Sequence, residues 1–126
     1  MQKREVVCSD RLPAGQLPIS QAIRVGTTIY CSGHVATDPA TGLLMSGDIE
    51  AQTARVLQNL NIVLEAAGSS LQRVVKATVF LAAKEDFAGM NRVFAQYFPK
   101  DPPARSTIRV DLMGDAKIEI EVIAVD

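Results

Sequence analysis

The chain has 126 residues, of which 48% are hydrophobic and 21% are charged, and its formal net charge is −1 at pH 7. These totals fit one globular domain covering residues 1–126, and no block of like charge indicates nucleic-acid or membrane-surface binding. No stretch approaches the roughly 18 apolar residues of a membrane span, and no long apolar run follows the N-terminal charges as in a secretory signal. We therefore expect a cytoplasmic protein with neither a nucleic-acid nor a membrane partner.

The first half of the chain contains three short β-rich runs and one long helical pattern. Residues 4–9, 21–25 and 27–32 read as strands, the last two joined by a tight turn. Residues 48–67 carry apolar side chains at spacings of three and four, with acidic residues in the first turn and a glycine after the end. This pattern predicts an amphipathic helix.

The second half alternates strands with a shorter helix. Residues 73–81 predict a buried strand, residues 85–98 a helix that Pro99 ends, and residues 104–110 and 117–125 two further strands. The order β-β-β-α-β-α-β-β predicts an α+β fold, a six-stranded mixed sheet with two helices packed on one face. The other face is then solvated or buried against another subunit, and we expect a homo-oligomer.

The last two strand-like runs alternate with period two, so each has two distinct faces. Arg105, Thr107 and Arg109 share one face of the first run, and Glu119 and Glu121 share one face of the second. The short loop over residues 112–116 predicts an antiparallel hairpin. That hairpin would place an arginine and a glutamate on the same surface of the sheet, with Arg109 opposite Glu119.

Arg105 and Glu119 are the main candidates for chemistry. Arg105 follows two prolines, and a guanidinium at a strand start can hold a carboxylate by two parallel hydrogen bonds. The alternative is a salt bridge from Arg105 to Glu119 or Glu121. Glu119 either acts as a general base that places water or simply pairs with Arg109.

Other polar residues fit structural roles better. Asn91 lies on the apolar side of its helix, and we expect its amide to make a structural hydrogen bond to a backbone loop. His34 is the only histidine and reads as a turn residue, so no metal site is expected. Cys8 and Cys31 form no C-x-x-C pair and read as reduced thiols, and the sequence leaves open whether either is redox-active.

An ordered set of segments along nearly the whole chain resembles the YjgF/RidA family. The matching segments are residues 21–26, 29–34, 38–42, 64–68, 74–80, 86–91, 103–106 and 117–121. The resemblance implies a chorismate-mutase-like fold and a homotrimer with ligand clefts between subunits. It also implies hydrolytic deamination of reactive 2-imino and enamine acids, such as 2-aminoacrylate and 2-iminopropionate, to 2-keto acids and ammonia, with no cofactor.

The resemblance also suggests roles for individual residues. Arg105 matches the arginine that grips the substrate carboxylate, and Glu119 matches the glutamate associated with the attacking water. Asn91 matches an asparagine near the cleft, and Ser32 and Gly33 match a strand end at the cleft wall. The implied partner is a small-molecule carboxylate.

Three positions depart from the family pattern. Ile19 stands where a tyrosine commonly reaches the cleft, Thr107 where a cysteine is common, and His34 where glutamine is common. The loss of the tyrosine hydroxyl leaves a second function open, a carboxylate-binding module that senses a metabolite without turnover. Ribonuclease or chaperone activity is a third alternative, which the near-neutral charge and sparse aromatic residues do not favour.

Overall fold

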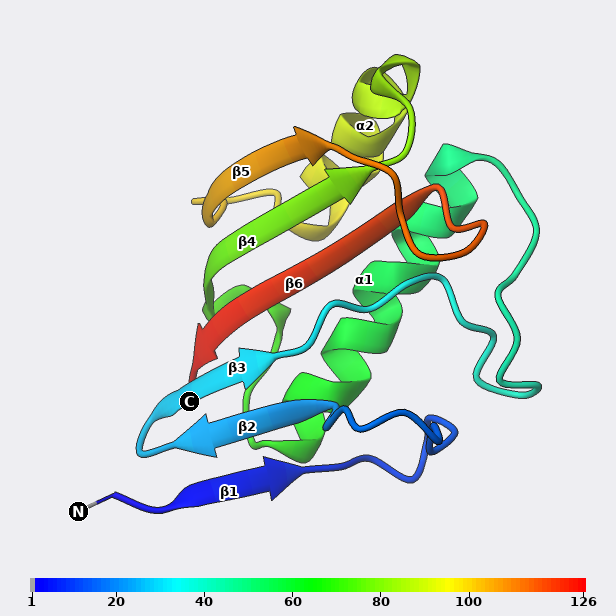
Figure 1. Ribbon diagram of the computed structural model, residues 1–126. Helices are drawn as coiled ribbons and strands as arrows, with labels where there is room; N and C mark the ends of the chain where they lie inside the picture. The colour runs from blue at the N-terminus through cyan, green and yellow to red at the C-terminus, as the bar shows by residue number, and fades with distance from the viewer. Residues whose placement is uncertain (1) are drawn as a thin grey trace.

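The computed structural model describes residues 2–126 as a single mixed sheet with two α-helices on one of its faces (Figure 1). The elements in chain order are β1 (Arg4–Val7), β2 (Ala22–Val25), β3 (Thr28–Cys31), α1 (Ile49–Ala66), the 3-10 turn η1 (Leu71–Arg73), β4 (Val74–Leu81), the 3-10 turn η2 (Lys84–Asp86), α2 (Phe87–Tyr97), β5 (Ala104–Arg109) and β6 (Ile118–Val125). The predicted order of strands and helices and the α+β class are confirmed.

The ends of α1 follow from local chemistry. The Asp48 side chain accepts a hydrogen bond from the backbone N–H of Ala51 at 2.9 Å and so satisfies one of the free donors of the first turn. Gly68 follows the end of the helix at a φ of 81°, a left-handed conformation that favours glycine. In residues 2–126, neither helix combines the length and apolarity that a membrane crossing requires.

The core lies between the helices and the sheet, and β6 is its central strand. The residues of β6 that point toward the helices are Ile118, Ile120, Val122 and Ala124, each at most 2% exposed. They pack against the apolar stripe of α1, which includes Leu57, Leu60, Val63 and Leu64. This alternation gives each strand one apolar face, and the burial of that face is the main stabilising contribution.

The strand order is β1-β2-β3-β6-β4-β5, so the predicted hairpin between the last two strands is wrong. β4 lies between them, parallel to β5 and antiparallel to β6. The connection over residues 110–117 passes the end of β4, where the Val110 N–H donates to Leu81 and the Ala82 N–H donates to Lys117. It spans two strand spacings, about 10 Å, which a loop of this length covers easily.

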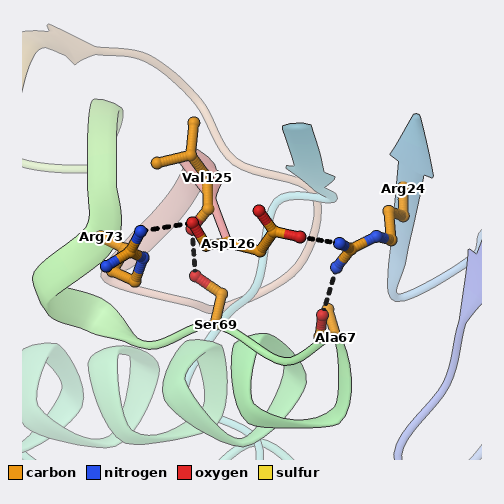
Figure 2. Close-up of polar contacts among 6 residues, drawn as sticks. All are labelled: Arg24, Ala67, Ser69, Arg73, Val125 and Asp126. Carbon is orange, nitrogen blue, oxygen red and sulfur yellow. Dashed lines mark hydrogen bonds and ion pairs between the residues drawn. The ribbon is translucent and has the colours of Figure 1, made fainter. Parts of the chain in front are cut away.

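A set of polar contacts ties the end of β6 to three other elements (Figure 2). The Arg24 guanidinium on β2 pairs with the Asp126 carboxylate and donates to the Ala67 carbonyl, at the end of α1, at 2.5 Å. Ser69 and Arg73 donate to the carbonyls of the last two residues. These contacts satisfy carbonyls at the end of α1 and of the sheet, so they fix the helix against the strands.

The sheet face away from the helices carries aliphatic and aromatic side chains that remain accessible. Val6 is 60% exposed, Tyr30 49% and Ile108 45%. Glu119 and Glu121 lie on the same face, so its character is mixed. As predicted, both helices of residues 2–126 lie on the other face of the sheet (Figure 1).

Candidate functional site

Arg105 and Glu119 lie on opposite faces of the sheet, which corrects the expectation that they share one. Arg105 is opposite Ala77 on β4, and Ala77 is fully buried beneath the helices. Glu119 is opposite Phe80, which lies on the open face. Cross-strand partners share a face, so the two side chains point in opposite directions; their positions are about 10 Å apart across two strand spacings and about 10 Å apart along the strands.

Arg105 is held by the apolar side of α2. Its guanidinium lies over the Phe94 ring at 4.8 Å from the centroid and within 6.0 Å of the Phe87 ring, while an N–H points to the Met90 sulfur at 3.7 Å. These contacts stack the planar group and fix its orientation. Burial lowers the pKa of Arg105 from its ordinary value, although the group stays charged at neutral pH.

No carboxylate pairs with Arg105 within residues 2–126, so the alternative of a salt bridge to Glu119 or Glu121 is wrong. The guanidinium instead borders a hollow of about 270 Å³. This hollow is lined by Asn91, Phe94, Ala95, Phe98, Pro102, Pro103 and Arg105. We call this region the arginine half-site. A cation without an acidic partner at the rim of a mostly apolar hollow can bind an organic anion.

Asn91 and Thr107 both lie near Arg105. Asn91, on α2, lines the hollow, and among residues 2–126 its amide has no hydrogen-bond partner, so the expected structural bond to a loop is absent. Thr107 is opposite Val79 and therefore points to the same face as Arg105. The structure thus brings Arg105, Asn91 and Thr107 together on one side of the sheet.

Glu119 lies at the start of β6 against Gly33. The Cα of Gly33 has so little space beside it that a methyl group there would stand 2.2 Å from the Glu119 Oε2. Burial raises the pKa of Glu119, and the nearby negative charge of Glu121 raises it further. A carboxylate with a raised pKa is suited to accept a proton from water or to orient it.

The loop over residues 17–21 borders the strand end that carries Gly33. The Ser32 hydroxyl donates to the Ser20 carbonyl at 2.6 Å, and its N–H donates to Gln21 at 3.0 Å. Ile19 is 63% exposed on this loop. A hollow of about 250 Å³ includes Ile19, Ser32, Gly33 and His34 in its lining. We call this region, together with Glu119, the glutamate half-site.

His34 is more than a turn residue. Its backbone bridges to Ile120 on β6, and its Nε2 lies 3.3 Å from the Gln21 carbonyl. Burial lowers the pKa of His34, while the contact with Gln21 opposes that shift. A largely neutral imidazole that donates to Gln21 therefore joins the loop to the strand end.

The remaining candidates stay outside these half-sites. Burial raises the pKa of Cys31 to about 12, so its thiol is unreactive, and Cys8 is exposed. No group of three or more possible metal ligands occurs within residues 2–126. Larger hollows of about 430 and 560 Å³ lie around Arg11 beside α1, but that arginine already pairs with Glu65 at 3.1 Å.

Sequence reasoning missed the aromatic support of Arg105. The spacing of Phe87, Met90 and Phe94 indicates one apolar side of the helix over residues 85–98, but it does not predict a contact with Arg105. The strand–helix–strand order around them typically produces a parallel pair of strands with the helix over one face. For this chain, that rule places β5 beside β4 with α2 over one face of the pair.

Comparison with known proteins shows the family to which the chain belongs. The family model described as Endoribonuclease L-PSP matches residues 10–126. The chain belongs to this family, the YjgF/RidA family. It is 45% identical over 122 residues to a RutC family protein of Pyrococcus abyssi, covering 96% of both chains. It is 41% identical over 123 residues to the mouse 2-iminobutanoate/2-iminopropanoate deaminase, covering 97% of this chain and 91% of the mouse protein.

A solved structure of a family member is also closely similar. The crystal structure of Escherichia coli TdcF with bound serine superposes with a TM-score of 0.90 at 33% identity, covering 97% of this chain and 98% of TdcF. Its fold is therefore the fold described above. The family includes proteins named deaminases.

Proposed function

We propose that this protein hydrolyses reactive 2-imino acids and their enamine tautomers to 2-keto acids and ammonia. The proposal rests mainly on the position of Arg105. Its guanidinium lies over the Phe94 ring at the rim of an apolar hollow, and it has no acidic partner among residues 2–126. The deaminase name of the mouse relative supports the same substrate class. So does the serine bound to TdcF, because serine carries an α-carboxylate.

Arg105 binds the carboxylate of the substrate in this proposal. Its planar fork can donate two parallel hydrogen bonds, and the Phe94 ring keeps the plane in place. Two bonds fix the carboxylate in one orientation, so the carbon–nitrogen double bond next to it is presented in a defined direction. Asn91 lines the same hollow and borders the bound substrate, and Thr107 lies two residues further along the same face of β5.

Glu119 places the attacking water. The water oxygen adds to the imine carbon while one water proton passes to the Glu119 carboxylate, and the protonated carboxyl returns that proton to the nitrogen to give a carbinolamine. The carbinolamine hydroxyl proton is then transferred to the nitrogen, the carbon–nitrogen bond breaks, ammonia leaves and the keto group forms. Water is the only co-reactant, and an α-imino acid is electrophilic enough for this modest acid–base assistance.

The two half-sites meet across a subunit interface in this proposal. Within one chain Arg105 and Glu119 point to opposite faces, so one substrate cannot contact both. A second copy that packs the edge strand β5 against the open face would bring its arginine half-site to the glutamate half-site of its neighbour. The exposed apolar side chains of that face, such as Val6 and Tyr30, favour such burial, and we propose a homotrimer.

A carboxylate-binding module without turnover is the second candidate. The separation of Arg105 from Glu119 within one chain favours it, because Arg105 alone is sufficient to bind a carboxylate. Ile19 favours it as well, since an alkyl side chain on the glutamate half-site can neither donate a hydrogen bond nor transfer a proton.

The deciding experiment measures keto acid and ammonia release from 2-iminopropanoate generated enzymatically in the assay. We expect the wild type to accelerate release over the uncatalysed reaction and Arg105→Ala to abolish the acceleration. Arg109→Ala is the matched control, because Arg109 lies on the same strand and face but its side chain is 62% exposed. Binding of 2-oxobutanoate without acceleration would establish the binding module instead. Light scattering of the same samples tests the trimer.

A further inference from the structure

Gly33 makes the closest approach to a neighbouring side chain of any glycine in residues 2–126. A Cβ at this position would lie 2.2 Å from the Glu119 Oε2, 2.9 Å from its Cδ and 3.1 Å from its Cγ. The φ of Gly33 lies outside the left-handed region, so its backbone conformation suits any residue. The glycine at this position is therefore explained by the Glu119 side chain and not by the backbone.

The backbone around Gly33 cannot withdraw to make room. The next residue, His34, donates its N–H to the Ile120 carbonyl at 2.9 Å and accepts from the Ile120 N–H at 3.0 Å. On its other side, the Ser32 N–H donates to Gln21. Gly33 is thus held beside Glu119 by hydrogen bonds on both sides, and an added methyl group has to displace the carboxylate.

Glu119 has no competing constraint. Among residues 2–126 no hydrogen bond or ion pair forms to its carboxylate. Phe80, opposite on β4, offers only an apolar surface, and the nearest charge on its own strand, Glu121, repels it. The shape of the space over Gly33 is what determines where the carboxylate lies.

We infer that Gly33 is a positioning residue for the proposed reaction: its missing side chain leaves the space in which the Glu119 carboxylate lies and places water. This inference rests on the proposed function. Its consequence is specific, because the displaced group is the end of a flexible side chain and the fold can tolerate the change. Gly33→Ala turns the carboxylate toward solvent without touching Arg105, which lies on the opposite face of the sheet.

The test is a double-mutant cycle of Gly33→Ala and Glu119→Ala in the deaminase assay, with thermal unfolding of each variant. We expect Gly33→Ala to lower kcat about 100-fold, the lower end of what a positioned base contributes, with KM within about two-fold of wild type. In the Glu119→Ala background the second substitution has no further effect on kcat, because no carboxylate remains to be displaced. Unchanged kcat in Gly33→Ala, or equal losses in both backgrounds, overturns the inference.

A readout that needs no turnover separates this inference from the proposed function. The ¹³C NMR titration of the Glu119 carboxyl reports its surroundings, which include Glu121 on the same face of β6, Lys117 before it and His34 beside Gly33. We expect Gly33→Ala to move the titration toward the ordinary pKa of a glutamate, because the carboxylate becomes solvated. An unmoved titration overturns the inference even in an active enzyme, and a moved one supports it even if deamination is absent.

The cycle also remains decisive if Gly33→Ala fails to fold. Recovery of folding in the double variant shows that the methyl group and the Glu119 side chain compete for one space, which supports the inference. Failure of both variants to fold means that Gly33 is required by its own backbone, which overturns it.

Discussion

Replacing Arg105 by lysine tests whether the geometry of the guanidinium, beyond its charge, binds the substrate. Lysine keeps the positive charge but offers no planar fork and cannot stack on Phe94 as the guanidinium does at 4.8 Å. A hydrogen bond to a charged group contributes about 1.5–3 kcal/mol, so losing one of two parallel bonds costs about 1.5–3 kcal/mol. At about 1.4 kcal/mol for each ten-fold change, Kd rises about 12- to 140-fold.

The assay is calorimetric titration with 2-oxobutanoate, a keto acid that cannot react further. Arg109→Lys is the control, because that side chain lies on the same strand and face, 62% exposed and 4.0 Å from Asp111. We expect the control to change Kd by less than about two-fold, since exposed ion pairs contribute little. A Kd for Arg105→Lys within about three-fold of wild type refutes bidentate binding by a stacked guanidinium.

Two further predictions concern the pH profile and the core. In wild type, deamination falls as pH decreases through the raised pKa of Glu119, because the protonated carboxyl no longer accepts a proton. Burial is the larger cause of the raised pKa of Glu119, and the negative charge of Glu121 is the smaller one. Glu121→Gln removes only that charge, so we expect the acidic limb of the rate profile to move modestly to lower pH. An acidic limb that stays in place or moves to higher pH contradicts the role of Glu119 as the base. Ile118→Ala, at a fully buried position of β6, lowers the free energy of unfolding by about 2–5 kcal/mol in denaturant titrations. Met113→Ala, at a position 97% exposed, changes it by less than about 0.5 kcal/mol, and equal effects of the two variants would contradict the described core.

The elements of the fold follow from the sequence because their signals are local. The helix over residues 48–67 is indicated by its own apolar stripe and by Asp48, and the structure places α1 within one residue of that range at each end. β6 is indicated by strict alternation, and its apolar side is the buried one, as expected. These signals involve residues only a few positions apart, so they can be identified in the sequence without knowledge of the tertiary structure.

Strand pairing depends on distant segments, and there the sequence misled. A short loop between residues 104–110 and 117–125 favoured a hairpin, but the connection instead crosses the end of β4. Alternation correctly grouped Arg105 with Thr107, and Glu119 with Glu121. Alternation does not show which face of each strand the helices cover, so the prediction that Arg105 and Glu119 share one face of the sheet was wrong. The sequence pattern does not predict that the Glu119 side chain lies over Gly33, because a glycine after a strand is also what an ordinary turn requires.

Different physical means determine the positions of the two functional side chains. Arg105 is held by direct attraction, with its guanidinium stacked on Phe94 and directed toward Met90. Glu119 is held by shape alone, in a space that exists because Gly33 has no side chain. Since these supports lie on opposite faces of the sheet, they are open to separate perturbation. Changes in α2 therefore act on carboxylate binding and appear in KM, whereas changes at the end of β3 act on the placement of water and appear in kcat.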